Sequence, residues 1–318
     1  MVNNFNMKEI MENCKNKKYN DIAKKGSASC FDYSDDYVVV AHNNSKASEN
    51  FKQLSEKLGD NSKCIYTVVD YNVDEDNKAY ELQRKAKGEH FRIDGIKQHT
   101  YDGIARLERY VEKMKKDIAE GKNDKTIEYV NEYYKDNLKK YKDKISSPEF
   151  STYLNTRGEE LNRRYSMIME MPKEHLVDFF ESILILQDNK MEYDSSGNNI
   201  LYDKDNGFSI IDLTDCSRRK NMKADVSTLL DSNNYQTMNI LLGVNKFSEL
   251  HEEEKPIVQK NMKSALLKIC SSIQGLEYNG EKLTKDMIEK SLETYKEYGL
   301  EFSPEEIDNI MNKGHSML

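Results

Sequence analysis

An apolar helix followed by a β-hairpin, at residues 174–213, constrains this chain more than any other stretch. Large apolar side chains recur at helical spacing within residues 174–188 and form a stripe wide enough for a deep core position. Apolar runs at 200–202 and 208–213 then flank a polar turn that ends in Asn206-Gly207, which is typical of a hairpin. A fold for this chain must therefore bury this helix beside this hairpin.

Upstream of that helix, the sequence alternates between strand and helix signals. A polar arm at residues 1–20 precedes runs that are rich in β-branched and aromatic residues and are bounded by turn residues. These runs predict strands at 21–27, 28–33, 37–42, 64–70 and 78–83, with one amphipathic helix at 48–58 after the third strand. The order predicts a small α+β domain over residues 21–88.

The predicted secondary structure changes from mainly strands to mainly helices near Gly88. From about Tyr101 the sequence is mainly helical and rich in charge, and residues 104–144 read as a solvated helical hairpin. Residues 89–318 are thus predicted to form a larger helical domain that contains the loop and hairpin at 189–215.

Charge and composition narrow the function classes. The chain has 318 residues, which fits about two domains, and its net charge of −8 argues against a nucleic-acid partner. No apolar stretch approaches the length of a membrane span, so no membrane partner is expected. The five cysteines are scattered without metal-binding or disulfide spacing, which favours a reducing, cytoplasmic location.

Asp194, Asn199 and Asp212 bracket the hairpin. Because a hairpin brings its beginning and its end together, their side chains are predicted to lie at one edge. Phosphoryl transfer needs a carboxylate beside the attacking hydroxyl and oxygen ligands that hold Mg²⁺ on the phosphates. The purely structural alternative is that Asp194 and Asn199 form Asx turns and that Asp212 caps a helix.

The run Asp194-Ser195-Ser196-Gly197-Asn198-Asn199 resembles the catalytic loop of the protein-kinase-like superfamily, in which an Asn follows the catalytic Asp by five positions. The preceding buried helix, the hairpin and the position of Asp212 extend the resemblance, which is closer to aminoglycoside and choline kinases than to typical protein kinases. It implies a bilobed protein-kinase-like α+β fold, with a small antiparallel N-lobe and a helical C-lobe that bind ATP and Mg²⁺. It also implies a catalytic role for Asp194 and metal binding by Asn199 and Asp212.

The same resemblance assigns the nucleotide-binding residues. The turn at Lys25, Gly26 and Ser27 would cover the phosphates. Gln83 and Lys85 belong to the stretch that would meet the adenine.

One departure concerns the third strand, at residues 37–42, which lacks the lysine that this family places there. The residues that could replace this cation are His42, Lys24, Lys25 and Lys46. Glu49 and Glu56 are the candidates for a helix carboxylate that would pair with it.

The sequence therefore favours an ATP- and Mg²⁺-dependent phosphotransferase that moves a γ-phosphoryl group to a hydroxyl of a small molecule or a protein. The missing lysine leaves open a pseudokinase-like protein that binds partners without catalysis. A helical interaction protein, in which the Asp–Asn spacing is coincidental, is the third alternative.

Overall fold

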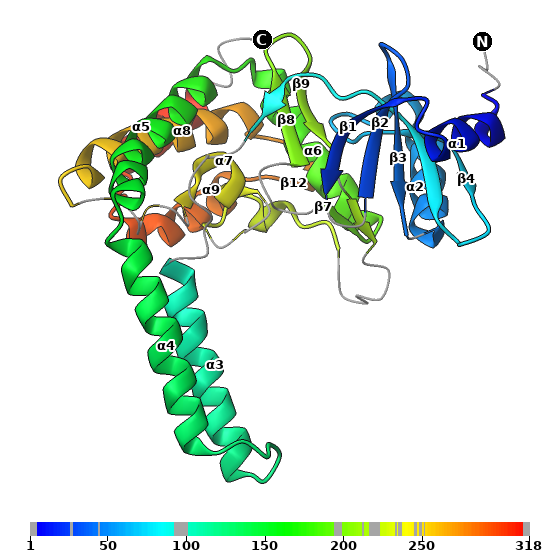
Figure 1. Cartoon of the computed structure of the whole chain (residues 1–318). Coiled ribbons are helices and arrows are strands. Elements are labelled where there is room, and N and C mark those ends of the chain that lie inside the picture. The colour runs from blue at the N-terminus through cyan, green and yellow to red at the C-terminus, as the bar shows by residue number, and fades with distance from the viewer. Residues whose placement is uncertain are drawn as a thin grey trace.

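The structure is a computed structural model, and it describes residues 5–25, 28–43, 45–91, 101–193, 199–211, 213–215, 223–232, 234, 237–244, 247, 250 and 252–313. Its N-terminal part is built on a five-stranded antiparallel sheet with the strand order β1-β2-β3-β5-β4 (Figure 1). The strands are β1 (Asn20–Lys25), β2 (Ala28–Asp32), β3 (Tyr37–His42), β4 (Val68–Val73) and β5 (Ala79–Arg84).

Two helices accompany this sheet. Helix α1 (Met7–Lys15) lies within the polar arm, where the Asn6 side chain caps it by accepting a hydrogen bond from the Glu9 amide. Its apolar face packs on Val39 and Ala41 of β3. Successive side chains of a strand point to opposite faces, so His42 lies on the other face, where it meets helix α2 (Ser45–Leu58).

The predicted strand at 64–70 is displaced, because β4 begins only at Val68. The Ile210 amide donates to the Cys64 carbonyl at 2.8 Å, and the Tyr66 amide donates to the Ile210 carbonyl at 3.1 Å. The link between α2 and β4 is therefore bonded to the C-terminal part of the chain. Burial in this link, rather than in the small sheet, explains the apolar character of residues 64 and 65.

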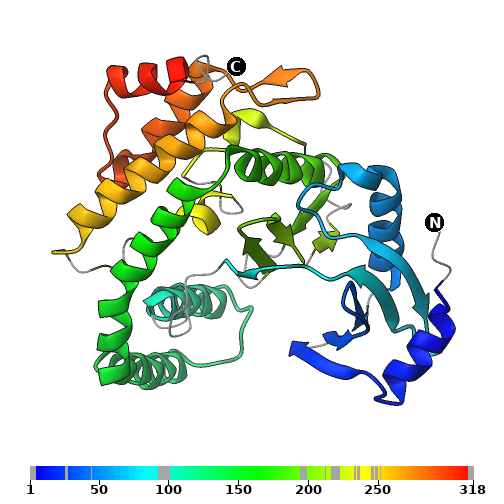
Figure 2. The same ribbon diagram turned by 90° about the horizontal axis from the view of Figure 1, so that it is seen from above.

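The C-terminal part is mainly helical (Figure 2). Its helices are α3 (Tyr101–Ala119), α4 (Ile127–Ile145), α5 (Pro148–Glu170), α6 (Lys173–Asp188), α7 (Met238–Leu242), α8 (Lys255–Ile273), α9 (Lys285–Glu293) and α10 (Pro304–Lys313). The apolar stripe predicted at 174–188 is α6, and it is buried in the largest hydrophobic core. This core also receives apolar side chains of α5 and α8.

Several short strands form small sheets outside the five-stranded sheet. A three-stranded sheet has the order β6-β8-β9 and consists of β6 (Glu89–His90), β8 (Ile200–Asp203) and β9 (Gly207–Ile210). The predicted hairpin is therefore confirmed over residues 200–210, whereas Leu213, predicted to end its second strand, begins β10 (Leu213–Asp215) instead. Two further pairs are β7 (Met191–Tyr193) with β10 (Leu213–Asp215), and β11 (Glu277–Tyr278) with β12 (Glu281–Lys282).

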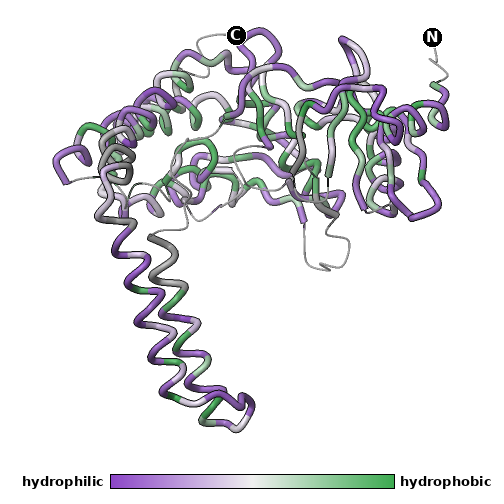
Figure 3. Tube along the Cα trace, viewed as in Figure 1, coloured by the Kyte–Doolittle hydropathy of each residue, from purple (hydrophilic) through white to green (hydrophobic). Residues whose placement is uncertain are grey.

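Helices α3 and α4 form an antiparallel hairpin that projects from the rest of the molecule, as Figures 1 and 3 show. Hydrophilic residues predominate along both helices (Figure 3). The hairpin has its own small core of Leu107, Val111, Met114 and Val130. The solvated helical hairpin predicted at 104–144 is thus confirmed.

The predicted α+β class is confirmed, with an antiparallel sheet in the N-terminal part and helices in the C-terminal part. Among the described residues, no helix is both long and apolar enough to cross a membrane.

Candidate functional site

Two antiparallel strand pairs hold the residues that flank the predicted catalytic positions. Tyr193, at the end of β7, lies opposite Leu213 at the start of β10. The Ile211 amide donates to the Asn199 carbonyl at 2.9 Å, one residue beyond the β8–β9 ladder. Since two residues of chain span at most about 7 Å, Ile211 and Leu213 are neighbours in space. The structure therefore brings Asn199 and the chain neighbours of residues 194 and 212 to one edge.

A helix cap and buried side chains fix the position of β7 at this edge. Helix α6 ends at Asp188 and is capped by Asn189, whose side-chain amide donates to the Ile185 carbonyl at 2.7 Å, and Lys190 adopts a positive φ of 54°. The reversal leads directly into β7, where Met191 and Tyr193 are buried. The core thus fixes the strand that immediately precedes residue 194 in the sequence.

Asn199, immediately before β8, is 4% exposed. Its amide oxygen belongs to the class of hard donors that Mg²⁺ accepts, as do the carboxylates predicted beside it. Asp194 and Asp212 lie outside the described residues, as do Gly26, Ser27 and the side chain of Lys25. Within the described ranges, no three His, Cys, Asp or Glu side chains gather in a metal-binding group.

Tyr193, next to the predicted catalytic Asp194 in the sequence, has a buried hydroxyl. Burial raises the pKa of Tyr193 well above the ordinary tyrosine value. Its hydroxyl has no hydrogen-bond partner among the residues that the structure describes. The phenol is therefore neutral and contributes no charge to this edge.

The residues predicted to meet the adenine lie at the end of β5 and just after it. The Gln83 side chain is buried, and its Nε2 donates to Glu81 Oε2 at 2.6 Å. Lys85 Nζ donates to Asp32 Oδ1 at 2.8 Å, and this hydrogen bond raises the pKa of Lys85. Both side chains are thus held by neighbours on the small sheet.

The third strand ends in a buried polar network that the sequence analysis missed. His42 Nε2 lies 2.8 Å from Glu81 Oε1, and Ser48 Oγ of α2 lies 3.2 Å from the same nitrogen. Glu49 and Glu56 are exposed on α2, so the carboxylate beside His42 comes from β5 instead. His42 thus ends the strand that lacks a lysine, and the described residues pair it with Glu81.

No known family model matches the chain, and no curated protein matches it. Among solved structures, the gentamicin–APH(2")-IIa complex is 16% identical over 100% of this chain and 98% of that chain, with a TM-score of 0.24. The streptomycin–ATP–APH(2")-IIa ternary complex is 14% identical over 92% of this chain and 97% of that chain, also with a TM-score of 0.24. Such TM-scores are too low to carry an argument, so the function is inferred from the geometry of the chain itself.

Proposed function

We propose that this chain is an ATP- and Mg²⁺-dependent phosphotransferase that moves a γ-phosphoryl group to a hydroxyl of a small molecule or a protein. The observation that supports the proposal is the pairing of Tyr193 with Leu213 and of Ile211 with Asn199. This pairing gathers one amide and the neighbours of two carboxylates at one edge, and phosphoryl transfer requires such a set of oxygen groups.

In this proposal each of these residues has a separate role. Asp194 would orient the acceptor hydroxyl or remove its proton, while Asn199 and Asp212 would hold Mg²⁺. The metal, when bound, supplies positive charge to the phosphate oxygens. The turn at 25–27 would cover the phosphates, and the backbone around Gln83 and Lys85 would meet the adenine.

The His42–Glu81 contact favours a second candidate, a protein that binds nucleotide without transferring phosphate. The Nε2 of His42 already contacts the buried Glu81, whereas a lysine would offer an ammonium group on a long flexible side chain to a phosphate. Weaker charge stabilisation lowers the rate of transfer more than it lowers ground-state binding.

Calorimetric titration with ATP, in the presence and absence of Mg²⁺, tests the proposal. We expect binding that depends on Mg²⁺ in the wild type and is lost in Asp212→Asn. Asp205→Asn is the matched control, because Asp205 is exposed in the turn at the opposite end of the same hairpin. A folded protein that binds no ATP at millimolar concentration would contradict nucleotide binding. Mg²⁺-dependent binding that Asp212→Asn retains would contradict the metal assignment.

A further inference from the structure

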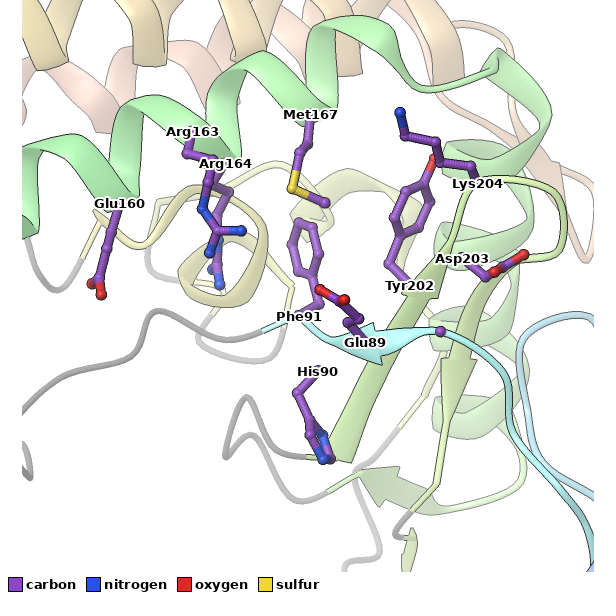
Figure 4. Close-up of a pocket in the computed structure, with 11 residues that line it drawn as sticks. Glu89, His90, Phe91, Glu160, Arg163, Arg164, Met167, Tyr202, Asp203 and Lys204 are labelled. Carbon is purple, nitrogen blue, oxygen red and sulfur yellow. The ribbon is translucent and has the colours of Figure 1, made fainter.

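A cavity of about 630 Å³ lies away from the proposed catalytic edge, between α5, β6 and the turn after β8 (Figure 4). One wall is a face of α5, where Glu160, Arg163, Arg164 and Met167 follow one another at helical spacing. The other wall consists of residues 88–91 and 202–204. Tyr202 is three residues along β8 from Asn199, which places it about 10 Å from the catalytic edge.

Arg164 is the buried charge in this cavity. Its Nη1 donates to the Ile240 carbonyl, and its guanidinium carbon lies 4.5 Å from the centre of the Phe91 ring. Within the described residues, no carboxylate lies close enough to Arg164 for an ion pair. A guanidinium has five donors, and a buried charge without a counter-charge is costly. Burial accordingly lowers the pKa of Arg164 to about 9.

The acidic side chains at this cavity are largely engaged elsewhere. Glu160 accepts a hydrogen bond from Arg157 at 3.3 Å, and the Asp203 carboxylate accepts from the backbone amides of its own turn. Among the described residues, Arg163 and Lys204 form no ion pair. Glu89 is exposed at the rim. The cavity therefore offers more uncommitted positive than negative charge.

The remaining lining is apolar and aromatic. Met167 projects toward the Phe91 ring, and Tyr202 stands beside them (Figure 4). The Phe91 and Tyr202 ring centres are 6.1 Å apart. A ligand with an apolar body can pack against these side chains while a charged group reaches Arg164.

We propose that this cavity binds a small organic oxyanion, a carboxylate or a phosphate monoester carried on an apolar ring or chain. Arg164 anchors the oxyanion from the buried wall, Arg163 and Lys204 add positive charge at the rim, and Met167 and Phe91 hold the apolar body. This site does not depend on the proposed phosphotransferase activity.

Calorimetric titration of the full chain with phenyl phosphate and with benzoate tests the proposal, with benzyl alcohol as the uncharged probe. We expect saturable binding of at least one oxyanion, and binding of benzyl alcohol at least about tenfold weaker. The two oxyanions distinguish a phosphate from a carboxylate ligand.

Substitutions of residues that line the cavity test whether the probe binds there. Arg164→Lys keeps the charge but loses the planar fork, and we expect affinity to fall by about tenfold or more. Met167→Trp places a bulky ring beside Phe91, where the apolar body of the ligand would lie, and should weaken binding by about tenfold or more, so it decides the question if Arg164→Lys does not fold. Lys260→Met removes an exposed charge on α8 and should change nothing. The proposal is overturned if neither oxyanion binds at millimolar concentration, or if a folded Met167→Trp protein binds as the wild type does.

Discussion

Glu81 Oε1 of β5 lies 2.8 Å from His42 Nε2 of β3, and only 1% of Glu81 is exposed. The other carboxylate oxygen accepts a hydrogen bond from Gln83 at 2.6 Å. Both oxygens of a carboxylate buried beside the small sheet are therefore satisfied. Because a buried charge is tolerated only when it is paired and hydrogen-bonded, the stability of the small sheet depends on this contact.

Glu81→Gln should lower the free energy of unfolding by about 1–3 kcal/mol, because a neutral amide replaces a charged acceptor in a buried network. Urea unfolding monitored by circular dichroism measures the change. Glu75→Gln is the matched control, since Glu75 is exposed in the turn between β4 and β5 and should stay within about 0.5 kcal/mol of the wild type. Equal effects of the two substitutions would show that the pair contributes little.

Asp194→Asn should separate binding from chemistry. If Asp194 positions or deprotonates the acceptor, the variant keeps its affinity for ATP with Mg²⁺ while transfer falls by about 10²–10⁴-fold. Hydrolysis of ATP by water, measured as phosphate release, serves where no acceptor is known. A wild type that binds ATP with Mg²⁺ but releases no phosphate favours the nucleotide-binding alternative. Phosphate release that Asp194→Asn leaves unchanged would remove Asp194 from the proposed mechanism.

Gly88→Ala should be more damaging than Gly121→Ala, although both glycines have positive φ, of 97° and 67°. A Cβ at residue 88 would lie 2.3 Å from the Tyr202 carbonyl oxygen, whereas one at residue 121 would meet nothing within 4 Å. Gly121→Ala therefore bears only the cost of backbone conformation, about 1 kcal/mol. Gly88→Ala adds a backbone clash, for which we expect about 1–3 kcal/mol more. Thermal and urea unfolding of the two variants provide the comparison.

Three buried thiols should be unreactive in the folded protein. Burial raises the pKa of Cys14 to about 11, and it raises the pKa values of Cys64 and Cys270 to about 12. Only the thiolate is alkylated, so at pH 8 iodoacetamide should modify these residues in urea but not in buffer, as peptide mass spectrometry would report.

The raised thiol pKa values also determine how the stability of the fold changes with pH. Between the ordinary cysteine pKa of 9.0 and these raised values, the folded state retains protons that the unfolded state has lost. Their contribution to stability is therefore complete below pH 9 and declines as the pH rises toward 11 and 12. A urea midpoint that stays constant from pH 8 to above pH 10 would contradict this expectation.

Local patterns predicted the elements that depend on local chemistry. The Asn206-Gly207 sequence favours a tight turn in which the glycine has a positive φ, and Gly207 has a φ of 78°. The hairpin is found where the sequence places it. The apolar stripe of α6 left no alternative to a buried helix. Helix α2 begins at Ser45, three residues before the predicted start, as is common for helix ends.

Features that depend on distant partners were not predictable. Residues 64 and 65 look like the start of a strand because they are apolar, but their partner is β9, more than a hundred residues later. Similarly, 39 positions separate His42 from Glu81, and nothing local marks them as a pair. The cavity at Arg164 draws its walls from three separate stretches of chain. The spacing of residues within one stretch cannot predict which distant stretches will come together.

The small sheet is bonded to the helical part through residues 62–67, which bond to β9, and through residues 85–91, where the Phe91 amide donates to the Ile200 carbonyl at 2.7 Å. Helix α2 adds further contacts, because Phe51 and Leu54 pack in the largest hydrophobic core and Lys57 Nζ donates to Asn189 Oδ1 at 2.7 Å. The two chain links adjoin β4 and β5, at one edge of the sheet, while β1 forms the opposite edge. A rigid rotation of the sheet about these links therefore moves β1 farther than it moves β4.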